Sequence, residues 1–309
     1  MSGPLLTRRQ FSAHCAALGL SLPALAAMAA SQSGPRTVRF PDGTSVPALG
    51  QGAWHLGQGR HSDAEEQEAV RAGIGLGMTL LDTSGNYGNG RSEQFLSKVI
   101  AGQRKRIYLV SKVESDEVSG DGIPRACAAS LARLGTDYLD LYLLHAPVPS
   151  EQLAGVVVEF EKLRAAGKIR SWGVSNFSTA QMEDLFRVPN GPHCATNQVA
   201  YSLGNRGIER DLLPWCTQHN IPVMAYSPLG GDNSRLVKDP ALAQIGSAHG
   251  CSAAAVALAW SIRSGTVIAI PESGSPAHAK ENAAALSVAL TPEDIGKLAT
   301  AYPGPAAAS

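Results

Sequence analysis

The amino-acid sequence predicts an α/β fold, a (β/α)8 TIM barrel preceded by an N-terminal β-hairpin. Eight short apolar runs alternate with amphipathic, helix-like segments over about 250 residues, the length typical of this barrel. The apolar runs are continuous, as in the strands of a parallel sheet covered by helices. The alternative is a doubly wound nucleotide-binding sheet, which should show G-x-G-x-x-G after its first strand. The first run instead reads Gly50-Gln51-Gly52-Ala53-Trp54 and enters no helix, so the barrel is favoured.

The chain enters this barrel through the predicted hairpin. Within residues 37–54, two short alternating runs flank Pro41-Asp42-Gly43-Thr44, a composition typical of a hairpin turn. The second run leads into the first barrel strand, which is expected at 48–52.

The rest of the barrel follows by alternation of strands and helices. Ser62 stands three residues before Glu65, which indicates a capping box and a first helix that ends within 73–77. Further strands are expected at 79–81, 107–111, 138–144, 169–174, 194–199, 221–225 and 266–270. Further helices are expected at 92–101, 122–134, 150–166, 178–187, 205–219 and 239–263, with a closing helix at 291–301. No linker rich in proline and serine follows residue 36, so residues 31–309 are expected to form one domain.

Residues 1–30 are predicted to be a twin-arginine-type signal peptide that lies outside the fold. Arg8 and Arg9 precede an apolar run rich in alanine and leucine, and Ala27-Met28-Ala29 offers a small-residue cleavage site. The run is too rich in alanine, and too interrupted by Pro23, for a stable membrane span. The mature chain is therefore expected to be periplasmic, or cytoplasmic if the signal is not functional.

The composition points to a small-molecule partner. Lys+Arg and Asp+Glu number 26 each, so the chain has no charge excess that would favour nucleic acid or an anionic membrane. The five cysteines form no CxxC pair and match no metal-binding spacing, so no metal is expected. Cys127 and Cys251 fall in alanine-rich helical stretches, where buried free thiols are expected.

Four polar residues occupy the carboxyl ends of neighbouring predicted strands, the face on which barrels build their reaction sites. Asp82, Lys112 and His145 follow three successive apolar runs, and Tyr87 lies in the loop rich in glycine and asparagine after Asp82. Each has a structural explanation by itself, as a turn cap, a solvated strand end or a packed histidine. Their coincidence at adjacent strand ends predicts a reaction site.

These four residue types suit carbonyl reduction. A tyrosine phenol titrates near pH ~10, and a nearby lysine is expected to lower that pKa so that Tyr87 can act as general acid. Asp82 would keep Lys112 charged and oriented, while His145 would direct a substrate oxygen. The set contains a proton donor but no nucleophile, metal or hydride source, and a nicotinamide supplies the hydride that side chains cannot.

Several longer motifs carry a resemblance to a known family. They read LLDTSGNYGNG, LVSKV, YLDLYLLHAP, GKIRSWGVSNF, ATNQVAYSL, MAYSPLGG and IPESGSPAHAKENAAAL. With them the chain, over roughly residues 37 to 303, resembles the aldo-keto reductases. The run GIERDLLPWC leading into PVMAYSPL is similar to the bacterial methylglyoxal-reductase-like branch. The resemblance implies a monomeric, NAD(P)H-dependent oxidoreductase that reduces small aldehydes and ketones, such as methylglyoxal, to alcohols.

The resemblance also implies roles for individual residues. It assigns the catalytic tetrad to Asp82, Tyr87, Lys112 and His145, and the substrate walls to Trp54, Tyr87 and His145. The implied cofactor contacts are Asp82, Ser175, Asn176 and Gln198 at the nicotinamide and its ribose, Tyr226 against the ring, Ser227 and Leu229 at the pyrophosphate, and Glu272, Ser273, His278 and Asn282 at the adenosine end.

The sequence departs from the family pattern in two places. Ala146 stands where the family often has tryptophan, so Trp54 is expected to supply the remaining aromatic wall. Glu272 and His278 stand where the family's NADP clamp usually has lysine and arginine. NADP(H) is implied by the resemblance, but Glu272 would repel a 2′-phosphate and could accept hydrogen bonds from a ribose diol, which would permit NAD(H). Ser273 still offers a phosphate donor.

Two other functions are open to a barrel of this kind. A non-catalytic nicotinamide-binding barrel acting as a redox sensor or regulatory subunit would keep the same tetrad. A metal-dependent hydrolase would need clustered histidine and carboxylate ligands at the strand ends, and only His145 meets that requirement.

Overall fold

The structure is a computed structural model that describes residues 36–231 and 234–305. All the described helices and strands lie between residues 36 and 305. The predicted signal peptide at 1–30 lies outside the described residues.

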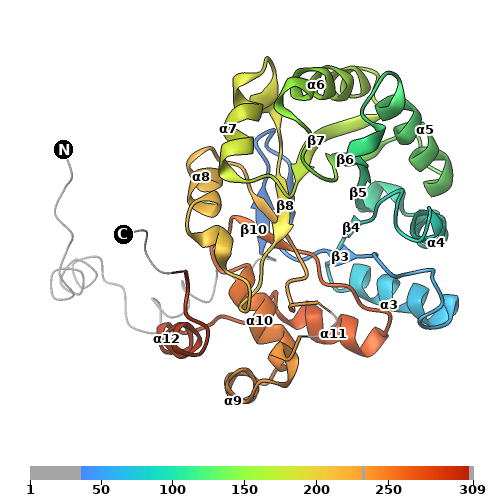
Figure 1. The fold of residues 1–309 in the computed structure, drawn as a ribbon. Helices are drawn as coiled ribbons and strands as arrows, with labels where there is room; N and C mark the ends of the chain where they lie inside the picture. The colour runs from blue at the N-terminus through green and yellow to red at the C-terminus, as the bar shows by residue number, and fades with distance from the viewer. Residues whose placement is uncertain (1–35, 232–233, 306–309) are drawn as a thin grey trace, which may run out of the picture. The chain divides into compact units, whose positions relative to one another are not determined.

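The predicted hairpin and the eight parallel strands are present (Figure 1). The hairpin pairs β1 (Thr37–Arg39) with β2 (Ser45–Pro47). The barrel strands are β3 (Gln51–Gly52), β4 (Leu80–Asp82), β5 (Tyr108–Val113), β6 (Leu139–Leu144), β7 (Ile169–Ser175), β8 (Asn197–Ala200), β9 (Val223–Tyr226) and β10 (Val267–Ala269). Each is paired in parallel with the next strand along the chain.

The helices surround this sheet, mostly between successive strands. They are α3 (Asp63–Gly75), α4 (Arg91–Ile100), α5 (Gly122–Leu134), α6 (Ser150–Ala165), α7 (Thr179–Arg187), α8 (Leu212–Gln218), α9 (Pro240–His249), α10 (Ala253–Ser261), α11 (Pro276–Ala284) and α12 (Pro292–Ala301). The strand and helix order is that of a (β/α)8 barrel.

Backbone bonds between the first and last strands close the barrel. Isolated parallel bridges join Leu49 to Ala269 and Gly52 to Glu272. The Gly50 and Gly52 amides donate to the carbonyls of Ala269 and of the residue before Glu272, at 2.8 and 3.0 Å. This closure confirms the barrel and brings the segment after β10 beside the segment after β3.

Alternation along the strands produces two apolar layers. Leu80 and Val110 pack with Met224 and other strand residues inside the barrel. Their neighbours Leu81 and Leu109 pack outward against the helices. The side-chain period of a strand is two, so every second residue of a strand points into the barrel.

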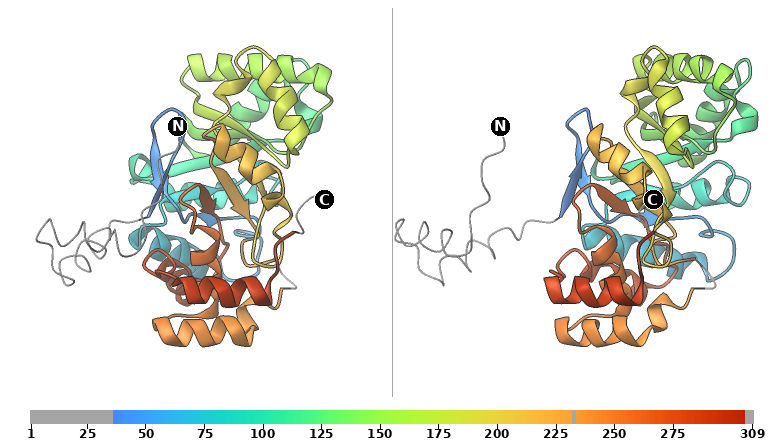
Figure 2. Two further views of the ribbon diagram at one scale, coloured as in Figure 1. Left: turned by 90° about the vertical axis from the view of Figure 1, so that its left-hand side faces the viewer. Right: turned by 60° about the vertical axis from the view of Figure 1, so that its left-hand side comes forward.

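The hairpin covers one end of the barrel. Its Phe40 ring stacks on Tyr108, the first residue of β5, with ring centroids 5.4 Å apart. Val38 and Val46 are buried in the same interior cluster. Figure 2 shows the hairpin, in blue, set against one end of the barrel. Because Tyr108 begins its strand, this covered end is the amino end, and the carboxyl end remains for the site.

Two predicted helices differ from the structure. The stretch at 239–263 is not one helix: α9 ends at His249, the next residue Gly250 has a left-handed φ of 64°, and Ser252 caps α10 by accepting from the Ala255 amide. Cys251, expected to be buried in a helix, lies at this break and is half-buried, whereas Cys127 is buried in α5 as expected. The stretch at 205–219 becomes helical only at α8, after a single turn of 3-10 helix.

Two smaller points concern the other helices. Ser62 caps α3 by accepting from the Glu65 amide at 3.3 Å, which is half of the predicted capping box. Among the described residues, no single helix is long and apolar enough to cross a membrane. The α9–α10 pair reaches that composition only as two helices bent by 90°, and every residue of α10 is buried.

Candidate active site

The strand geometry brings the four predicted residues together at the carboxyl end of the barrel. Asp82 shares the inward face of β4 with Leu80, and Lys112 shares the inward face of β5 with Val110. His145 follows the last residue of β6. The strand predicted at 107–111 extends through Lys112, so this lysine is part of the sheet and its side chain is fully buried.

The Lys112 ammonium is the centre of the tetrad. Its Nζ donates to Asp82 Oδ2 at 2.8 Å, to the Thr83 carbonyl at 2.9 Å and to the Tyr87 hydroxyl at 3.0 Å. The Tyr87 and His145 rings meet edge to face, with centroids 5.7 Å apart. A buried cation with three acceptors is fully satisfied, so its position is fixed by its hydrogen bonds.

The pKa of Tyr87 differs from the sequence-based expectation. Burial raises the pKa of the Tyr87 phenol, and the attraction of the Lys112 ammonium opposes this rise without cancelling it. The lysine lowers the pKa relative to an equally buried tyrosine, but not below the ordinary value. Burial alone would lower the pKa of Lys112, yet the charges and hydrogen bonds of Asp82 and Tyr87 outweigh it and the pKa is raised. The phenol is therefore protonated and the lysine charged at neutral pH.

The loop that carries Tyr87 is supported from below by an ion pair. Glu93 of α4 is completely buried; it accepts from the Ser111 hydroxyl at 2.6 Å and pairs with Arg133 of α5 at 2.5 Å. The Arg133 side chain lies against Gly90, where a Cβ atom would come within 2.6 Å of it. Gly90 also has a left-handed φ of 83°. The backbone of the Tyr87 loop is thus held in place by contacts that only glycine permits.

A second polar network continues from Asp82 across the strand ends. The Gln198 amide donates to Asp82 Oδ1 at 2.7 Å, and the Ser175 hydroxyl donates to the Gln198 carbonyl at 2.8 Å. Asn176, which has a left-handed φ of 63°, donates to the Ser175 hydroxyl and accepts from the Tyr226 hydroxyl at 3.0 Å. Left-handed asparagine directly after a strand is a form of backbone strain that tends to occur at functional sites.

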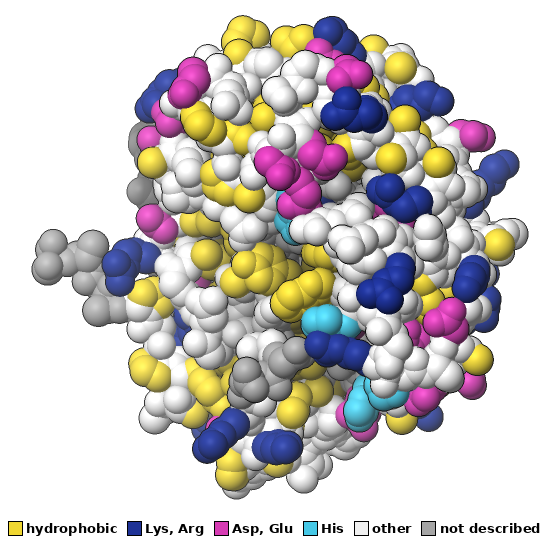
Figure 3. All heavy atoms as spheres, turned by 45° about the vertical axis from the view of Figure 1, so that its right-hand side comes forward, with side chains coloured by type: hydrophobic (Ala, Val, Ile, Leu, Met, Phe, Trp, Pro, Cys, Tyr) yellow, Lys and Arg dark blue, Asp and Glu magenta, His cyan; other side chains and the backbone are white. Residues whose placement is uncertain are grey.

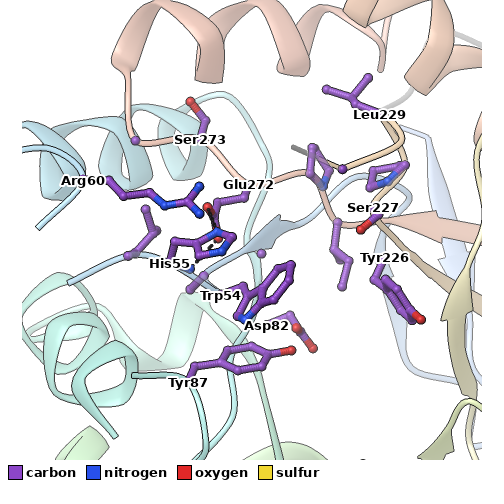
Figure 4. A pocket seen from close by; sticks show the side chains of 18 of the residues that line it. Trp54, His55, Arg60, Asp82, Tyr87, Tyr226, Ser227, Leu229, Glu272 and Ser273 are labelled. Carbon is purple, nitrogen blue, oxygen red and sulfur yellow. Dashed lines mark hydrogen bonds and ion pairs between the residues drawn. The ribbon is translucent and has the colours of Figure 1, made fainter. Parts of the chain in front are cut away.

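One cavity extends from these two networks, at the carboxyl end of the barrel, to the segment after β10 that contains Glu272 and His278. Its volume is about 760 Å³. Figure 3 shows the hollow, with apolar side chains on its walls, acidic side chains along one rim and histidine and basic side chains along the other. In Figure 4, Trp54 lies beside Tyr87 and Asp82, and Tyr226 and Ser227 face them across the cavity.

Most of the predicted site residues line this cavity. They are Trp54, Asp82, Tyr87, His145, Ser175, Asn176, Gln198, Tyr226, Ser227, Leu229, Glu272, Ser273 and His278. Lys112 is not among the lining residues, but its ammonium is bonded to two of them, Asp82 and Tyr87. Asn282 is buried in α11 and is not among the lining residues, and neither is Ala146. Trp54 is 56% exposed and forms the outer wall on the side of β3.

The Glu272 carboxylate is held by contacts with His55. The carboxylate accepts from the His55 backbone amide at 2.7 Å and lies 2.9 Å from His55 Nδ1. His55 in turn stacks on Trp54. This contact joins the segment after β10 to the loop after β3, beside the bridge that closes the barrel. In Figure 4 the Arg60 side chain points toward the same place, next to Glu272 and His55.

Sequence reasoning missed five residues at this site. Arg60, His55 and His61 line the cavity at the end that also holds His278. Glu114 and Ser84 contact His145 from outside the cavity lining. The available signal for Glu114 was its position two residues after Lys112, directly after β5. The three loop residues after Trp54 form no pattern.

In residues 36–231 and 234–305, no group of three histidine, cysteine or carboxylate side chains is arranged to hold a metal ion. An eight-stranded parallel barrel with a buried lysine bonded to a tyrosine at one end of a cavity has the kind of site found in barrel enzymes. The sequence comparisons then identify the family. A model of the aldo/keto reductase family matches residues 48–303, and the chain belongs to that family.

Individual relatives agree with this assignment. Methylglyoxal reductase YeaE of Escherichia coli (strain K12) is 47% identical over 273 residues, which cover 87% of this chain and 96% of that protein. An aldo/keto reductase from Klebsiella pneumoniae in complex with NADP and acetate has a TM-score of 0.85 and 44% identity, and covers 89% of this chain and 98% of its own. An aldo-keto reductase from the same organism in complex with NADPH has a TM-score of 0.84 and 45% identity, and covers 88% and 97%.

Proposed function

We propose that this enzyme reduces small aldehydes and ketones, of the methylglyoxal type, to alcohols with NADP(H). The observation that carries the proposal is the 3.0 Å hydrogen bond from the buried Lys112 ammonium to the Tyr87 hydroxyl at one end of the long cavity. It places a proton donor beside space for a second reactant. The similarity to a methylglyoxal reductase and to proteins solved with NADP and NADPH supports both the substrate class and the cofactor.

The residues along the cavity fit a nicotinamide dinucleotide. Tyr226 offers a half-buried aromatic face near the tetrad, and Asn176 and Gln198 offer amides beside it. Ser227, with a left-handed φ of 46°, presents its hydroxyl farther along the cavity. At the far end Arg60 adds a basic side chain. The order of aromatic, amide, hydroxyl and basic groups matches the order of ring, carboxamide and phosphates in the cofactor.

Each residue of the tetrad has a separate role in the reaction. When bound, the cofactor supplies a hydride to the carbonyl carbon. Tyr87 donates its hydroxyl proton to the carbonyl oxygen. Lys112 stabilises the negative charge that develops on the phenol oxygen, and Asp82 keeps the ammonium in place. His145, against the Tyr87 ring, directs the carbonyl oxygen toward the phenol.

Steady-state turnover tests this proposal. We expect the cofactor-dependent reduction of methylglyoxal or a nitrobenzaldehyde, followed by the loss of nicotinamide absorbance. A non-catalytic nicotinamide-binding barrel would bind the cofactor, as seen by tyrosine and tryptophan fluorescence, but would show no turnover with any carbonyl compound.

Glu272 is expected to weaken the preference for NADPH. Replacing Glu272 with lysine should raise the ratio of kcat/KM for NADPH to that for NADH by about tenfold or more, because a charge-assisted hydrogen bond contributes ~1.5–3 kcal/mol. Glu272→Gln is the matched control, since its amide oxygen can still accept from the His55 amide, and it should give a smaller rise. A tenfold or greater NADPH preference in the wild type that Glu272→Lys leaves unchanged would contradict this prediction.

We also propose that the enzyme is exported through the twin-arginine route and acts as a monomer. The Arg8-Arg9 pair and the apolar run after it support export. A tagged Arg8→Lys/Arg9→Lys variant should remain in the cytoplasm while the wild type reaches the periplasm; the same distribution for both would contradict export.

A further inference from the structure

Glu114 forms a close contact with His145 that the tetrad chemistry does not explain. It follows β5 directly, and its Oε1 lies 2.5 Å from His145 Nδ1. The Ser84 hydroxyl donates to the same oxygen at 3.3 Å. Burial works to raise the pKa of Glu114, but the hydrogen bonds from His145 and Ser84 and the charge of Lys112 outweigh it, so the pKa is lowered. Glu114 is therefore a carboxylate at neutral pH.

This contact decides which ring nitrogen of His145 carries a proton. A carboxylate only accepts hydrogen bonds, so Nδ1 must be protonated to face it. A neutral imidazole has one N–H, and Nε2 then carries a lone pair. Within the described part of the chain, the hydrogen bonds of the His145 ring are made by Nδ1, and His145 lines the cavity. Nε2 is thus the nitrogen left for a substrate.

A carbonyl substrate needs a donor from this nitrogen. The carbonyl oxygen accepts hydrogen bonds. In a neutral His145 held by Glu114, the lone pair of Nε2 would face the lone pairs of this oxygen, and no hydrogen bond could form. Nε2 can donate only when the imidazole carries both protons. The carbonyl oxygen would then receive two donors, the Tyr87 hydroxyl and Nε2–H, from rings that meet edge to face.

We propose that Glu114 is a positioning residue that makes carbonyl binding by His145 depend on the doubly protonated imidazole. The proposal rests on the proposed function, because it assumes a carbonyl oxygen beside Tyr87. It predicts that Glu114 controls how kcat/KM depends on pH.

The other charged groups near His145 do not supply this dependence. Tyr87 has a pKa raised by burial, above its ordinary value near ~10, so its phenol stays protonated through the neutral range. The Lys112 ammonium forms an ion pair with the Asp82 carboxylate, which balances its charge. Asn176, from the next strand end, donates to the His145 carbonyl and carries no charge. Glu114 is the carboxylate in direct contact with the imidazole.

The pH profile of a Glu114→Gln variant tests the proposal. In the wild type, kcat/KM for methylglyoxal should fall about tenfold per pH unit on the alkaline side. The glutamine amide can donate to Nδ1, which leaves Nε2–H on the neutral ring, so the alkaline limb should move up by about one pH unit or more, or flatten. Asp116→Asn, an exposed carboxylate two residues away, is the control and should keep the wild-type limb. A purely structural role would lower kcat/KM by the same factor at every pH, and an unmoved limb overturns the proposal.

Nitrogen NMR of the histidines gives a test without cofactor or turnover. In the wild-type protein, neutral His145 should be in the Nδ1–H form, and in Glu114→Gln the neutral ring should shift toward the Nε2–H form. An Nε2–H form in the wild type overturns the proposal whatever the variants do. Failure of the proposed function looks different: the wild type would reduce no carbonyl compound with either nicotinamide, and the NMR result would stand by itself.

Discussion

Replacing Tyr87 with phenylalanine is expected to lower kcat for carbonyl reduction by about 10²- to 10⁴-fold, the usual contribution of a positioned proton donor. The hydroxyl is the one polar atom of this side chain, and Lys112 Nζ donates to it at 3.0 Å. Phenylalanine keeps the ring that packs edge to face on His145, so the loop should not move. What is lost is the proton and the site where negative charge develops. The measurement is steady-state kinetics with methylglyoxal.

The control for this variant is cofactor binding. Tyr87 lines the cavity on the side of Trp54, across from Tyr226 and Ser227. The Kd for NADPH, from tyrosine and tryptophan fluorescence, should therefore change little. A Tyr87→Phe enzyme that turns over within about threefold of the wild type, a small part of the 10²-fold minimum expected of a proton donor, would rule out the proton-donor role. A large loss of cofactor affinity would show instead that the ring supports the cofactor.

The barrel and the tetrad could be predicted because both depend on short-range patterns. Continuous apolar runs identify parallel strands, and the polar residue that ends each run identifies the carboxyl face. Alternation then directs Asp82 and Lys112 inward without knowledge of their partners. The break between α9 and α10 was also within reach, because Gly250 followed by Ser252 is a helix stop and a helix cap inside the single predicted stretch.

Contacts between distant segments could not be predicted in the same way. Glu272 and His55 are 217 positions apart and meet only because the barrel closes between Gly52 and Glu272. Glu114 reaches His145 because β5 and β6 are paired in one register, which no pattern in a single sequence specifies. The pKa of Tyr87 depends on how deeply the phenol is buried. The nearby lysine predicts only the opposing part of that shift.

Replacing Lys112 with methionine is expected to damage both stability and activity. Lys112 and Asp82 form an ion pair that is almost completely buried, at 2.8 Å. Removing the ammonium leaves the Asp82 carboxylate with the Gln198 amide as its remaining side-chain donor. An uncompensated buried charge costs about 3–5 kcal/mol, so the free energy of unfolding, measured by urea denaturation, should fall by about that amount. The pKa of Tyr87 should also rise further, because the one group that lowers it is gone.

The double variant Asp82→Asn/Lys112→Met separates these two effects. With both charges removed, no buried carboxylate remains uncompensated, and most of the lost stability should return. The kcat should stay low by about 10²-fold or more, because the neutral pair cannot stabilise negative charge on the Tyr87 oxygen. If the double variant recovered kcat together with stability, Lys112 would be a structural partner of Asp82 and not part of the proton-donor system. If neither variant lost activity, the phenol would donate its proton without the lysine, and burial alone would set its chemistry.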